Sequence, residues 1–369
     1  MSMVEWKKLG EICTIRNGYT PSTKISENWE GGNIPWFTLE DIRKNGRFLN
    51  DSIKHITPLG VKKGVLFPKD SIIISTTATI GEYAIVYKDF ICNQQISCLS
   101  VADKKLITPK YLLYYAYFIG RWCMKNVNGG GSLLIVSTSK LQRIPIPVPS
   151  LNVQERTVNI LDTFTSSIEN LKEQIALRRK QYEYYRDQLL DLEGKEGVEM
   201  RQLETIAEIG TGSSNTQDEL EKGKYPFFVR SQIVRWKDEY EFDETAIITS
   251  GDGVGVGKVL HYYEGKYALH QRAYRIHIIV EDVIPKFLFY FMQKDFYNYI
   301  MSNAYAASVT SVRKPMLLKY PIPVPSLAEQ QRIVDILDKF EASIQNLEAQ
   351  LSLREKQYEY YRNKLLTFE

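Results

Sequence analysis

PIPVPSLNVQERTVNILDTFTSSIENLKEQIALRRKQYEYYRDQLL, residues 145–190, returns as PIPVPSLAEQQRIVDILDKFEASIQNLEAQLSLREKQYEYYRNKLL at residues 321–366. The two stretches are 176 residues apart, and 30 of their 46 positions are identical without a gap. A repeat of this length indicates two copies of one structural unit. We therefore expect the chain to present two similar surfaces to a partner that is itself two-fold or bipartite.

Each copy of the repeat predicts a long coiled-coil helix. Alternating prolines from Pro145 to Pro149 favour an extended approach, and Ser150 is a natural N-cap. Beyond it, seam positions recur every three and four residues without Gly or Pro, which over four heptads makes a helix of ~55–60 Å. Neither seam can be buried alone, so the two helices are expected to pack on each other, antiparallel. The seam positions are Leu161, Phe164, Ile168, Leu171, Ile175, Arg178, Tyr182, Tyr185 and Leu189, and then Leu337, Phe340, Ile344, Leu347, Leu351, Arg354, Tyr358, Tyr361 and Leu365.

One arginine interrupts each seam, Arg178 in the first copy and Arg354 in the second. One interpretation is that the aliphatic stem packs in the seam while the guanidinium reaches solvent. The other is a polar site that sets the register by pairing with a carboxylate of the facing helix, such as Glu169 or Glu183. The residues leave both open.

The segments in front of the two copies are related but divergent. Their alignment drifts from a shift of 194 residues (Leu9, Ile12, Ile15 and Gly18 against Leu203, Ile206, Ile209 and Gly212) through 191 (Pro35–Phe37 against Pro226–Phe228) to 176 (Pro109–Leu112 against Pro285–Leu288). Short β-rich runs bounded by turn residues predict mixed α/β domains, with one helix opening at Pro109 and another at Pro285. The predicted strands are Ser71–Ser75, Tyr83–Tyr87, Ile96–Val101, Ala246–Thr249 and Tyr274–Val280.

The predicted organisation is an α+β chain with internal pseudo-two-fold symmetry. Two globular mixed α/β domains are separated by two long antiparallel coiled-coil helices. The predicted bounds are 1–150 for the first domain, 151–190 for the first helix, 191–198 for a polar Gly-bearing linker, 199–326 for the second domain and 327–369 for the second helix.

Composition places the chain among ordinary soluble globular proteins. It has 369 residues, 44% hydrophobic and 25% charged, and its net charge of +3 neither requires nor excludes a nucleic-acid partner. The four cysteines lack CxxC spacing and are expected to be reduced, buried thiols, with no disulfide and no metal site. The N-terminus does not read as a signal peptide, and the most apolar run, Tyr111–Met124, is too short to span a bilayer. A cytoplasmic location is expected.

The motifs of common enzymes are missing from the sequence. The run Gly251–Lys258, GDGVGVGK, fails the phosphate-loop pattern because that pattern needs Gly at 252 and Ser or Thr at 259, where Asp252 and Val259 stand. Its counterpart in the first domain is Ser75–Gly81, and both are predicted to be tight loops between strands. HExxH, GxSxG and the Pro-Pro-aromatic motif of amino-methyltransferases are also absent. We predict that the chain is not an enzyme.

Both divergent domains place polar side chains suited to DNA in predicted loops. Arginine can bond guanine in two places, Asn and Gln can do so with adenine, and Ser, Thr and Lys can hold phosphates. In the first domain the candidates are Arg16, Asn17, Thr20, Thr76, Thr77, Thr79, Asn93, Gln94 and Gln95. In the second they are Ser213, Asn215, Arg230, Ser231, Arg235, Ser250, Asp252, His270, Gln271 and Arg272. The strongest match is between Asn93–Gln95, the first polar triplet, and His270–Arg272, the second polar triplet.

With these residues in view, the chain resembles the specificity subunit of Type I restriction–modification systems. The resemblance covers nearly the whole chain and rests on a junction motif that occurs twice, together with the layout of the variable domains, including Ile80–Gly81 before Asn93–Gln94. The junction residues are Pro147, Pro149, Leu151, Gln154, Arg156, Ile160, Leu161 and Asp162, repeated at Pro323, Pro325, Leu327, Gln330, Arg332, Ile336, Leu337 and Asp338. One departure is His270, which stands where the first domain has Asn93, so one role for both triplets is not implied.

The resemblance implies that each variable domain is a target recognition domain that reads one half of a bipartite, asymmetric site in double-stranded DNA. The helix pair would set the unread spacer and dock two methyltransferase (modification) subunits, with restriction subunits joining the full complex. Partner-binding residues implied by the junction are Leu151, Gln154, Arg156, Leu327, Gln330 and Arg332. No cofactor is expected in this chain; S-adenosylmethionine, ATP and Mg²⁺ are expected in the partner subunits.

Two alternatives stay open on the residues alone. One is a non-catalytic coiled-coil scaffold whose paired domains bind protein. The other is a fragment of a fused methyltransferase–specificity protein, which the absence of catalytic motifs disfavours.

Overall fold

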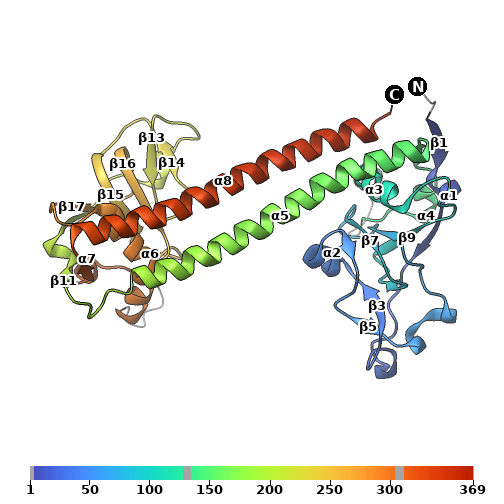
Figure 1. Cartoon of the computed structure of the whole chain (residues 1–369), viewed down its shortest axis with the longest axis horizontal. Helices are drawn as coiled ribbons and strands as arrows, with labels where there is room; N and C mark the ends of the chain where they lie inside the picture. Colours follow the sequence, from blue (N-terminus) through green and yellow to red (C-terminus); the bar gives the residue numbers. More distant parts are fainter. Residues whose placement is uncertain (1–3, 128–133, 304–310, 369) are drawn as a thin grey trace. The chain divides into compact units, whose positions relative to one another are not determined.

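The computed structural model of the chain describes residues 4–127, 134–303 and 311–368. Residue contacts divide the chain into two compact units. Unit 1 comprises Met1–Asn170 and Leu351–Glu369, and unit 2 comprises Leu171–Gln350. Each unit joins a mixed α/β body to one segment of α5 (Leu151–Leu189) and one segment of α8 (Leu327–Leu366), as Figure 1 shows.

In unit 1, strands are arranged in the sheet orders β2-β9-β6-β7-β4, β5-β3-β8 and β1-β10. The strands are β1 (Glu5–Lys8), β2 (Cys13–Asn17), β3 (Ile34–Phe37), β4 (Phe48–Leu49), β5 (His55–Ile56), β6 (Ser71–Ser75), β7 (Tyr83–Val86), β8 (Ile91–Cys92), β9 (Ile96–Val101) and β10 (Pro145–Val148). The shorter helices are α1 (Leu9–Ile12), α2 (Leu39–Asn45), α3 (Pro109–Lys125) and α4 (Thr138–Leu141), with 3₁₀ turns η1 (Ser26–Asn28), η2 (Pro58–Gly60) and η3 (Lys62–Gly64).

In unit 2, the sheet orders are β12-β17-β15-β16-β13-β14 and β11-β18. The strands are β11 (Glu199–Gln202), β12 (Ala207–Thr211), β13 (Tyr225–Phe228), β14 (Arg235–Lys237), β15 (Phe242–Ser250), β16 (Leu260–Leu269), β17 (Ala273–Ile278) and β18 (Pro321–Val324). The shorter helices are α6 (Pro285–Asn303) and α7 (Lys314–Leu318), with 3₁₀ turns η4 (Leu203–Thr205) and η5 (Thr216–Asp218).

The two units share one strand plan. In unit 1, Phe37 of β3 pairs in parallel with Cys92, and in unit 2 Phe228 of β13 pairs in parallel with Leu269. The antiparallel order β2-β9-β6-β7 likewise matches β12-β17-β15-β16. The long strand β16 takes the place of both β7 and β8. It pairs with β15 as β7 pairs with β6, and with β13 as β8 pairs with β3. The drifting sequence shifts therefore follow real structural equivalence.

Most predicted elements are observed close to their expected bounds. The strands predicted at Ser71–Ser75 and Ile96–Val101 are β6 and β9, and helices begin at Pro109 and Pro285 as expected. Ala246–Thr249 proved too short, because β15 starts at Phe242. Its first residues pair with β16 but are only partly buried, so they lack the apolar run that marks the rest of the strand.

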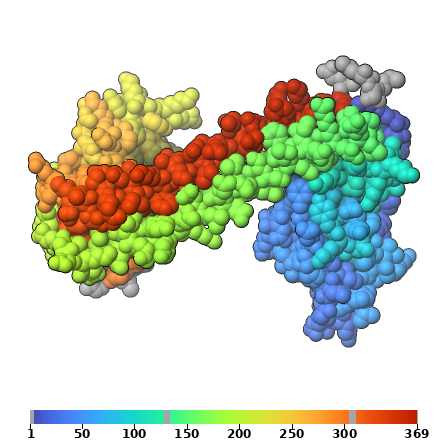
Figure 2. Space-filling model, viewed as in Figure 1, coloured from blue at the N-terminus to red at the C-terminus, as the bar shows by residue number. Residues whose placement is uncertain are grey.

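Helices α5 and α8 pack against each other within each unit, as Figure 2 shows. In unit 2, Tyr185 stacks on Phe340 at 5.4 Å between ring centroids, and Arg179 pairs with Glu348, so the α8 number rises as the α5 number falls. The packing is therefore antiparallel. In unit 1, Phe164 stacks on Tyr361 at 5.2 Å. These two contacts are the same contact, displaced by the 176-residue repeat.

The seam arginines follow neither proposed interpretation in full. The guanidinium carbon of Arg178 lies 5.8 Å from the ring centroid of Phe340, and that of Arg354 lies 5.6 Å from the ring centroid of Phe164. Each arginine therefore covers an aromatic face of the opposite helix, a contact that attracts cations. The charged ends thus lie over aromatic rings of the seam, where one interpretation expected solvent and the other a carboxylate.

Each α/β body has an apolar core that continues onto the long helices. In unit 1, Leu161 and Val158 of α5 join the core of the sheet and α3, together with Leu366 of α8. In unit 2, Ile333 and Leu337 of α8 do the same. The four cysteines are buried and free, as predicted, and burial raises the pKa of Cys13 to about 12. Among the described residues, none of the helices combines the length and apolar run needed to cross a membrane.

Candidate DNA interface

The two polar triplets occupy equivalent turns. The backbone N–H of Asn93 donates to the carbonyl of Phe37 at 3.0 Å, and that of His270 donates to the carbonyl of Phe228 at 2.9 Å. Because Phe37 and Phe228 are register-equivalent, each turn is attached to the same strand of its unit. The triplets that looked alike in sequence therefore lie at the same place in the fold.

The replacement of Asn93 by His270 preserves one role. The backbone N–H of Gln95 donates to Asn93 Oδ1 at 3.1 Å, and the backbone N–H of Arg272 donates to His270 Nδ1 at 3.0 Å. Asparagine commonly closes such turns with its side chain, and here the imidazole does the same. The first residue of each triplet thus shapes the turn. The third residues differ, because Arg272 is exposed whereas the Gln95 side chain accepts from Asn93 Nδ2 at 3.3 Å.

The Gly-rich and Thr-rich runs are loops between antiparallel strands, as predicted, and each contacts a triplet. The N–H of Thr76 donates to the carbonyl of Gln95, and the N–H of Gly251 donates to the carbonyl of Arg272, both at 2.9 Å. A bridge of Thr77 with Ile135 is matched by a bridge of Asp252 with Ser311. Loop and triplet therefore form one edge in each domain.

A glycine lets a further loop approach each edge closely. A Cβ on Gly18 would stand 2.2 Å from the carbonyl oxygen of Cys92, and one on Gly212 would stand 1.8 Å from that of Leu269. Real side chains do not reach such distances, so the backbone must carry glycine there. Gly18 and Gly212 were equivalent in the sequence alignment, and the structure supplies the reason.

In the first domain the predicted residues gather around the triplet, but they differ in accessibility. Gln94 and Thr20 are exposed and hydrogen-bonded to each other at 2.5 Å. Asn17 accepts from Ser97 and Thr138, and it is exposed with Thr79. Thr77 and Gln95 are half-buried. These groups form an edge rich in amides and hydroxyls.

Two first-domain candidates are engaged inside the protein. Arg16 donates to the carbonyl of Leu66 at 2.8 Å and lies over the ring of Phe67 at 4.5 Å. Thr76 is 3% exposed and bonded to Ser97 at 3.0 Å. Sequence composition could not separate these from exposed loop residues, because side-chain direction depends on neighbouring strands.

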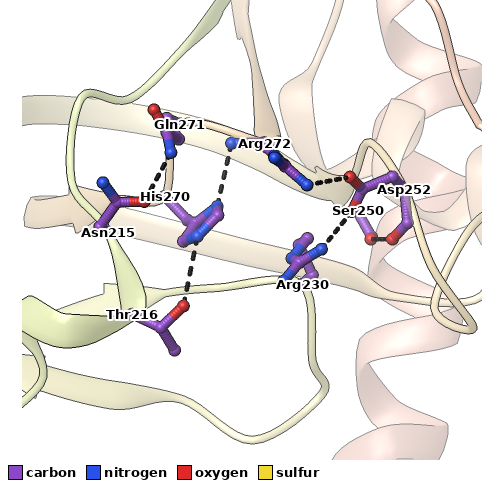
Figure 3. Close-up of polar contacts among 8 residues, drawn as sticks. All are labelled: Asn215, Thr216, Arg230, Ser250, Asp252, His270, Gln271 and Arg272. Carbon is purple, nitrogen blue, oxygen red and sulfur yellow. Dashed lines mark hydrogen bonds and ion pairs between the residues drawn. The ribbon is translucent and has the colours of Figure 1, made fainter.

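In the second domain, Asp252 holds two arginines together (Figure 3). Arg230 Nη1 donates to Asp252 Oδ1 at 2.6 Å, and Arg272 Nη1 lies 3.3 Å from Asp252 Oδ2. Ser250 Oγ donates to the backbone carbonyl of Asp252 at 2.7 Å and holds the loop. Burial opposes ionisation of Asp252, but the hydrogen bond and charge of Arg230, with the charge of Arg272, outweigh it and lower the pKa of this carboxyl.

Arg230 and Asp252 line a pocket of about 340 Å³ together with Ser231, Arg235 and His270. Burial lowers the pKa of His270, and the nearby positive charges of Arg230 and Arg272 lower it further. The imidazole is therefore neutral at pH 7, consistent with Nδ1 accepting the turn hydrogen bond.

The other second-domain candidates make polar contacts of their own. Gln271 donates to Asn215 Oδ1 at 2.5 Å, and both residues are exposed. Arg235 lies 3.5 Å from Glu219. Ser213, by contrast, donates through its backbone and hydroxyl to Glu241, which indicates a role in holding the loop.

Comparison with known proteins matches this duplicated plan. The family model for the Type I restriction modification DNA specificity domain matches residues 1–178 and again residues 195–353. The chain belongs to this family. It is the DNA-recognition component of a Type I restriction–modification system, and a non-catalytic one. Membership therefore does not favour the protein-scaffold alternative.

Individual relatives agree with the family match. The Type I restriction enzyme EcoprrI specificity subunit of Escherichia coli is 33% identical over 92% of this chain and 88% of its own length. The EcoR124I/EcoR124II specificity subunit, also of Escherichia coli, is 38% identical over 53% of this chain and 50% of its own length. The solved S subunit of M. genitalium aligns over 100% of this chain and 98% of its own length, at 16% identity with a TM-score of 0.66. These findings confirm the predicted fold class.

The junction residues of this specificity subunit fall into two groups. Gln154 and Gln330 are 0% exposed. Gln154 Nε2 donates to the carbonyls of Leu106 and Pro149, and its Oε1 accepts from Thr108 N, all at 2.9 Å. Gln330 makes the equivalent three bonds in unit 2. The prediction of a partner contact needs correction for both glutamines, because their side chains bind their own backbone.

The other junction residues remain candidates for partner contact. Arg156, Arg332 and Leu327 are exposed, and Leu151 is half-buried. Arg332 is paired with Glu329 on the same helix at 2.7 Å.

A second repeated clamp was missed in the sequence. Lys110 and Tyr114 of α3 bond the carboxylate of Asp162 on α5, both at 2.6 Å. Lys286 and Tyr290 of α6 bond Asp338 of α8 in the same way, at 2.8 and 2.5 Å. The four-residue spacing of Lys and Tyr, and their shift of 176, were available signals. The clamp joins each domain to its long helix, so part of the repeat is conserved within the chain for internal reasons.

An exposed apolar strip also repeats and was not singled out in the sequence. Leu177 and Tyr184 of α5 are 52% and 62% exposed, and Leu353 and Tyr360 of α8 are both 58% exposed. Seven residues separate the members of each pair, so they share a helix face outside the seam. Each unit carries one copy of this outer strip. Exposed repeated apolar groups commonly mark a protein interface.

Proposed function

We propose that the two domains of this specificity subunit read the two different halves of one bipartite DNA site. The observation that carries the proposal is that one loop framework occurs twice with different side chains. The turns, loop bridges and close glycines are equivalent. The accessible candidates are amides and hydroxyls in the first domain, whereas the second adds Arg230 and Arg272 to its exposed amides. A shared frame with changed chemistry is suited to reading different bases.

We further propose that the repeated helices dock two copies of a methyltransferase subunit. The outer strip and the exposed junction arginines give each unit the same partner-facing groups. Restriction subunits would join this core, and S-adenosylmethionine, ATP and Mg²⁺ would be bound by the partner subunits. The paired helices would also set the spacer, since α5 has 39 residues and is ~59 Å long at 1.5 Å per residue.

DNA reading is tested by fluorescence anisotropy on duplex DNA, with and without a cognate methyltransferase subunit. The reconstituted complex should bind a duplex carrying its bipartite target more tightly than a scrambled duplex. Its affinity should fall steeply between about 50 and 200 mM salt, because phosphate contacts release counterions. Equal binding to target and scrambled duplexes would contradict the proposal.

Docking is tested by changing the outer strip in one unit. The double variant Leu353→Ser, Tyr360→Ser should yield complexes with one methyltransferase where the wild type has two, as counted by native mass spectrometry. Ser352→Ala is the matched control, because Ser352 is exposed on the same helix and the equivalent residue of the other copy, Ala176, is already alanine. Two methyltransferases on the double variant would exclude the outer strip as the dock.

A further inference from the structure

Two positions on the edge formed by loop and triplet differ in chemistry between the domains. A bridge matches Asp252 with Thr77, and a backbone hydrogen bond matches Arg272 with Gln95. Arg230 stands two residues beyond Phe228, and two residues beyond Phe37 the first domain has Leu39, which is buried at the start of α2. The first domain thus has no counterpart of the arginine pair at these positions. Whatever the pair recognises belongs to one half-site only.

The arginine pair is held in place yet remains accessible. The side chains of Arg230 and Arg272 are 39% and 61% exposed, while the Asp252 carboxylate between them is 25% exposed. Each bond to Asp252 engages Nη1, and a guanidinium carries five N–H donors in a fixed fork. The carboxylate therefore fixes the orientation of two forks whose remaining donors can serve a ligand.

The central carboxylate favours a base edge over a phosphate as that ligand. A phosphate beside Asp252 would be repelled by a fixed negative charge, which also cancels half of the pair's positive charge. A guanine edge is neutral, and its O6 and N7 accept two parallel N–H bonds from one arginine. Fixed orientation helps such two-point bonding, because less side-chain freedom is lost on binding.

We propose that Asp252 makes Arg230 and Arg272 a guanine-reading unit, so that the half-site of the second domain contains guanine recognised in the major groove. This rests on the proposed division of the target between the two domains. The pocket between Arg230 and His270 gives the base edge its place. The amide edge of the first domain, with Gln94 exposed, lacks this unit and is suited to adenine.

The first step of the test assigns the half-sites. Ile233 is 64% exposed beside the pocket, and Ile233→Cys can carry a photo-crosslinker, since the native cysteines are buried. With the target sequence known from methylation-sensitive sequencing, cross-linking in the reconstituted complex identifies the half read by the second domain. A half-site without guanine on either strand would overturn the proposal.

The second step removes one acceptor from the DNA. Replacing the half-site guanine by 7-deazaguanine deletes N7 and leaves base pairing intact. Affinity should fall about 5- to 100-fold when the replaced guanine is the one that Arg230 and Arg272 contact. The same replacement at a guanine of the first half-site serves as the internal control. Unchanged affinity at every guanine of the second half-site would overturn the proposal.

The third step changes the protein. Arg272→Lys and Arg230→Lys keep the charge but lose the fork, so the preference for guanine should drop while non-specific affinity is retained. Lysine variants that keep the preference would show that these residues serve as point charges only. Circular dichroism and intact recognition of the first half-site establish that each variant is folded.

Asp252→Asn, compared with a charge change elsewhere, tests whether Asp252 acts by orienting the two arginines or only through its charge. It should weaken discrimination at the second half-site, whereas Glu264→Gln, the same charge change at an exposed site on β16, should not. Equal discrimination by the two variants would overturn the role of Asp252. Wild-type complex without preference at either half-site would instead refute the proposed function itself, so the two failures are distinguishable.

Discussion

Gln154→Ala should destabilise unit 1 without touching a partner surface. The change removes three hydrogen bonds, one buried and two partly buried, and leaves Thr108 N–H and the carbonyls of Leu106 and Pro149 without their partner. Each buried group left unsatisfied costs roughly 1–3 kcal/mol, and partial relaxation suggests a total of about 2–4 kcal/mol. For a unit of about 190 residues, this corresponds to a fall of roughly 5–10 °C in the midpoint of thermal unfolding.

Differential scanning calorimetry of the free chain is the assay. Gln154→Ala should lower the transition of unit 1, and Gln330→Ala should lower that of unit 2, because the clamp is duplicated. Arg156→Ala is the control: the side chain is exposed on the same helix turn, so both transitions should stay unchanged. If Gln154→Ala left both midpoints unchanged but abolished methyltransferase binding, the buried clamp would be refuted and a partner contact restored.

Three further outcomes are expected. Gly18→Ala, whose Cβ would meet Cys92 O at 2.2 Å, should weaken recognition of one half-site at least tenfold in anisotropy while the other half-site keeps its contribution. Deleting one heptad from both helices, residues 168–174 and 344–350, should shorten the unread spacer by ~3 base pairs, since seven residues rise ~10 Å. If methylation-sensitive sequencing showed an unchanged spacer, the helices would not set its length. Because the pKa of His270 is lowered in the folded chain, the unfolded chain protonates this histidine first as pH falls below about 6.5, which lowers the stability of unit 2 on acidification. His270→Asn should reduce this loss of stability between pH 8 and pH 5.5, as measured by thermal unfolding. The same pH dependence in variant and wild type would contradict a lowered pKa of His270.

Elements marked by long sequence patterns were predicted better than elements marked by short ones. The helices were readable because nine seam positions repeat in each copy, and both antiparallel aromatic stacks use those positions. Short strands with one partly exposed end were less readable, as the truncated prediction for β15 illustrates. Pairing with β16, which brings distant residues together, completes that strand.

The candidate site was readable as clusters but not as individual side chains. The two polar triplets were matched in sequence and occupy the same turn. Arg16 and Arg272, however, place the same guanidinium group in different surroundings. Arg16 lies over the ring of Phe67, whereas Arg272 is exposed beside Asp252. Arg16 was predicted to lie in a loop but lies on β2, and its partner Leu66 is distant along the chain, so local composition holds no information on this difference.

The sequence by itself determined that this protein is a duplicated chain with two long seam-forming helices and two divergent domains, because period and identity are properties of the chain alone. Only the tertiary structure decided which repeated residues face outward. Gln154 was predicted to face a partner, and Asp162 belongs to the same junction motif, yet both clamp a domain to its own helix, while Leu177 and Tyr184 stand exposed. Identity between the copies indicates that a residue has the same role in both. Only its burial and hydrogen bonds, which depend on packing in three dimensions, show whether that role is in the fold or in binding a partner.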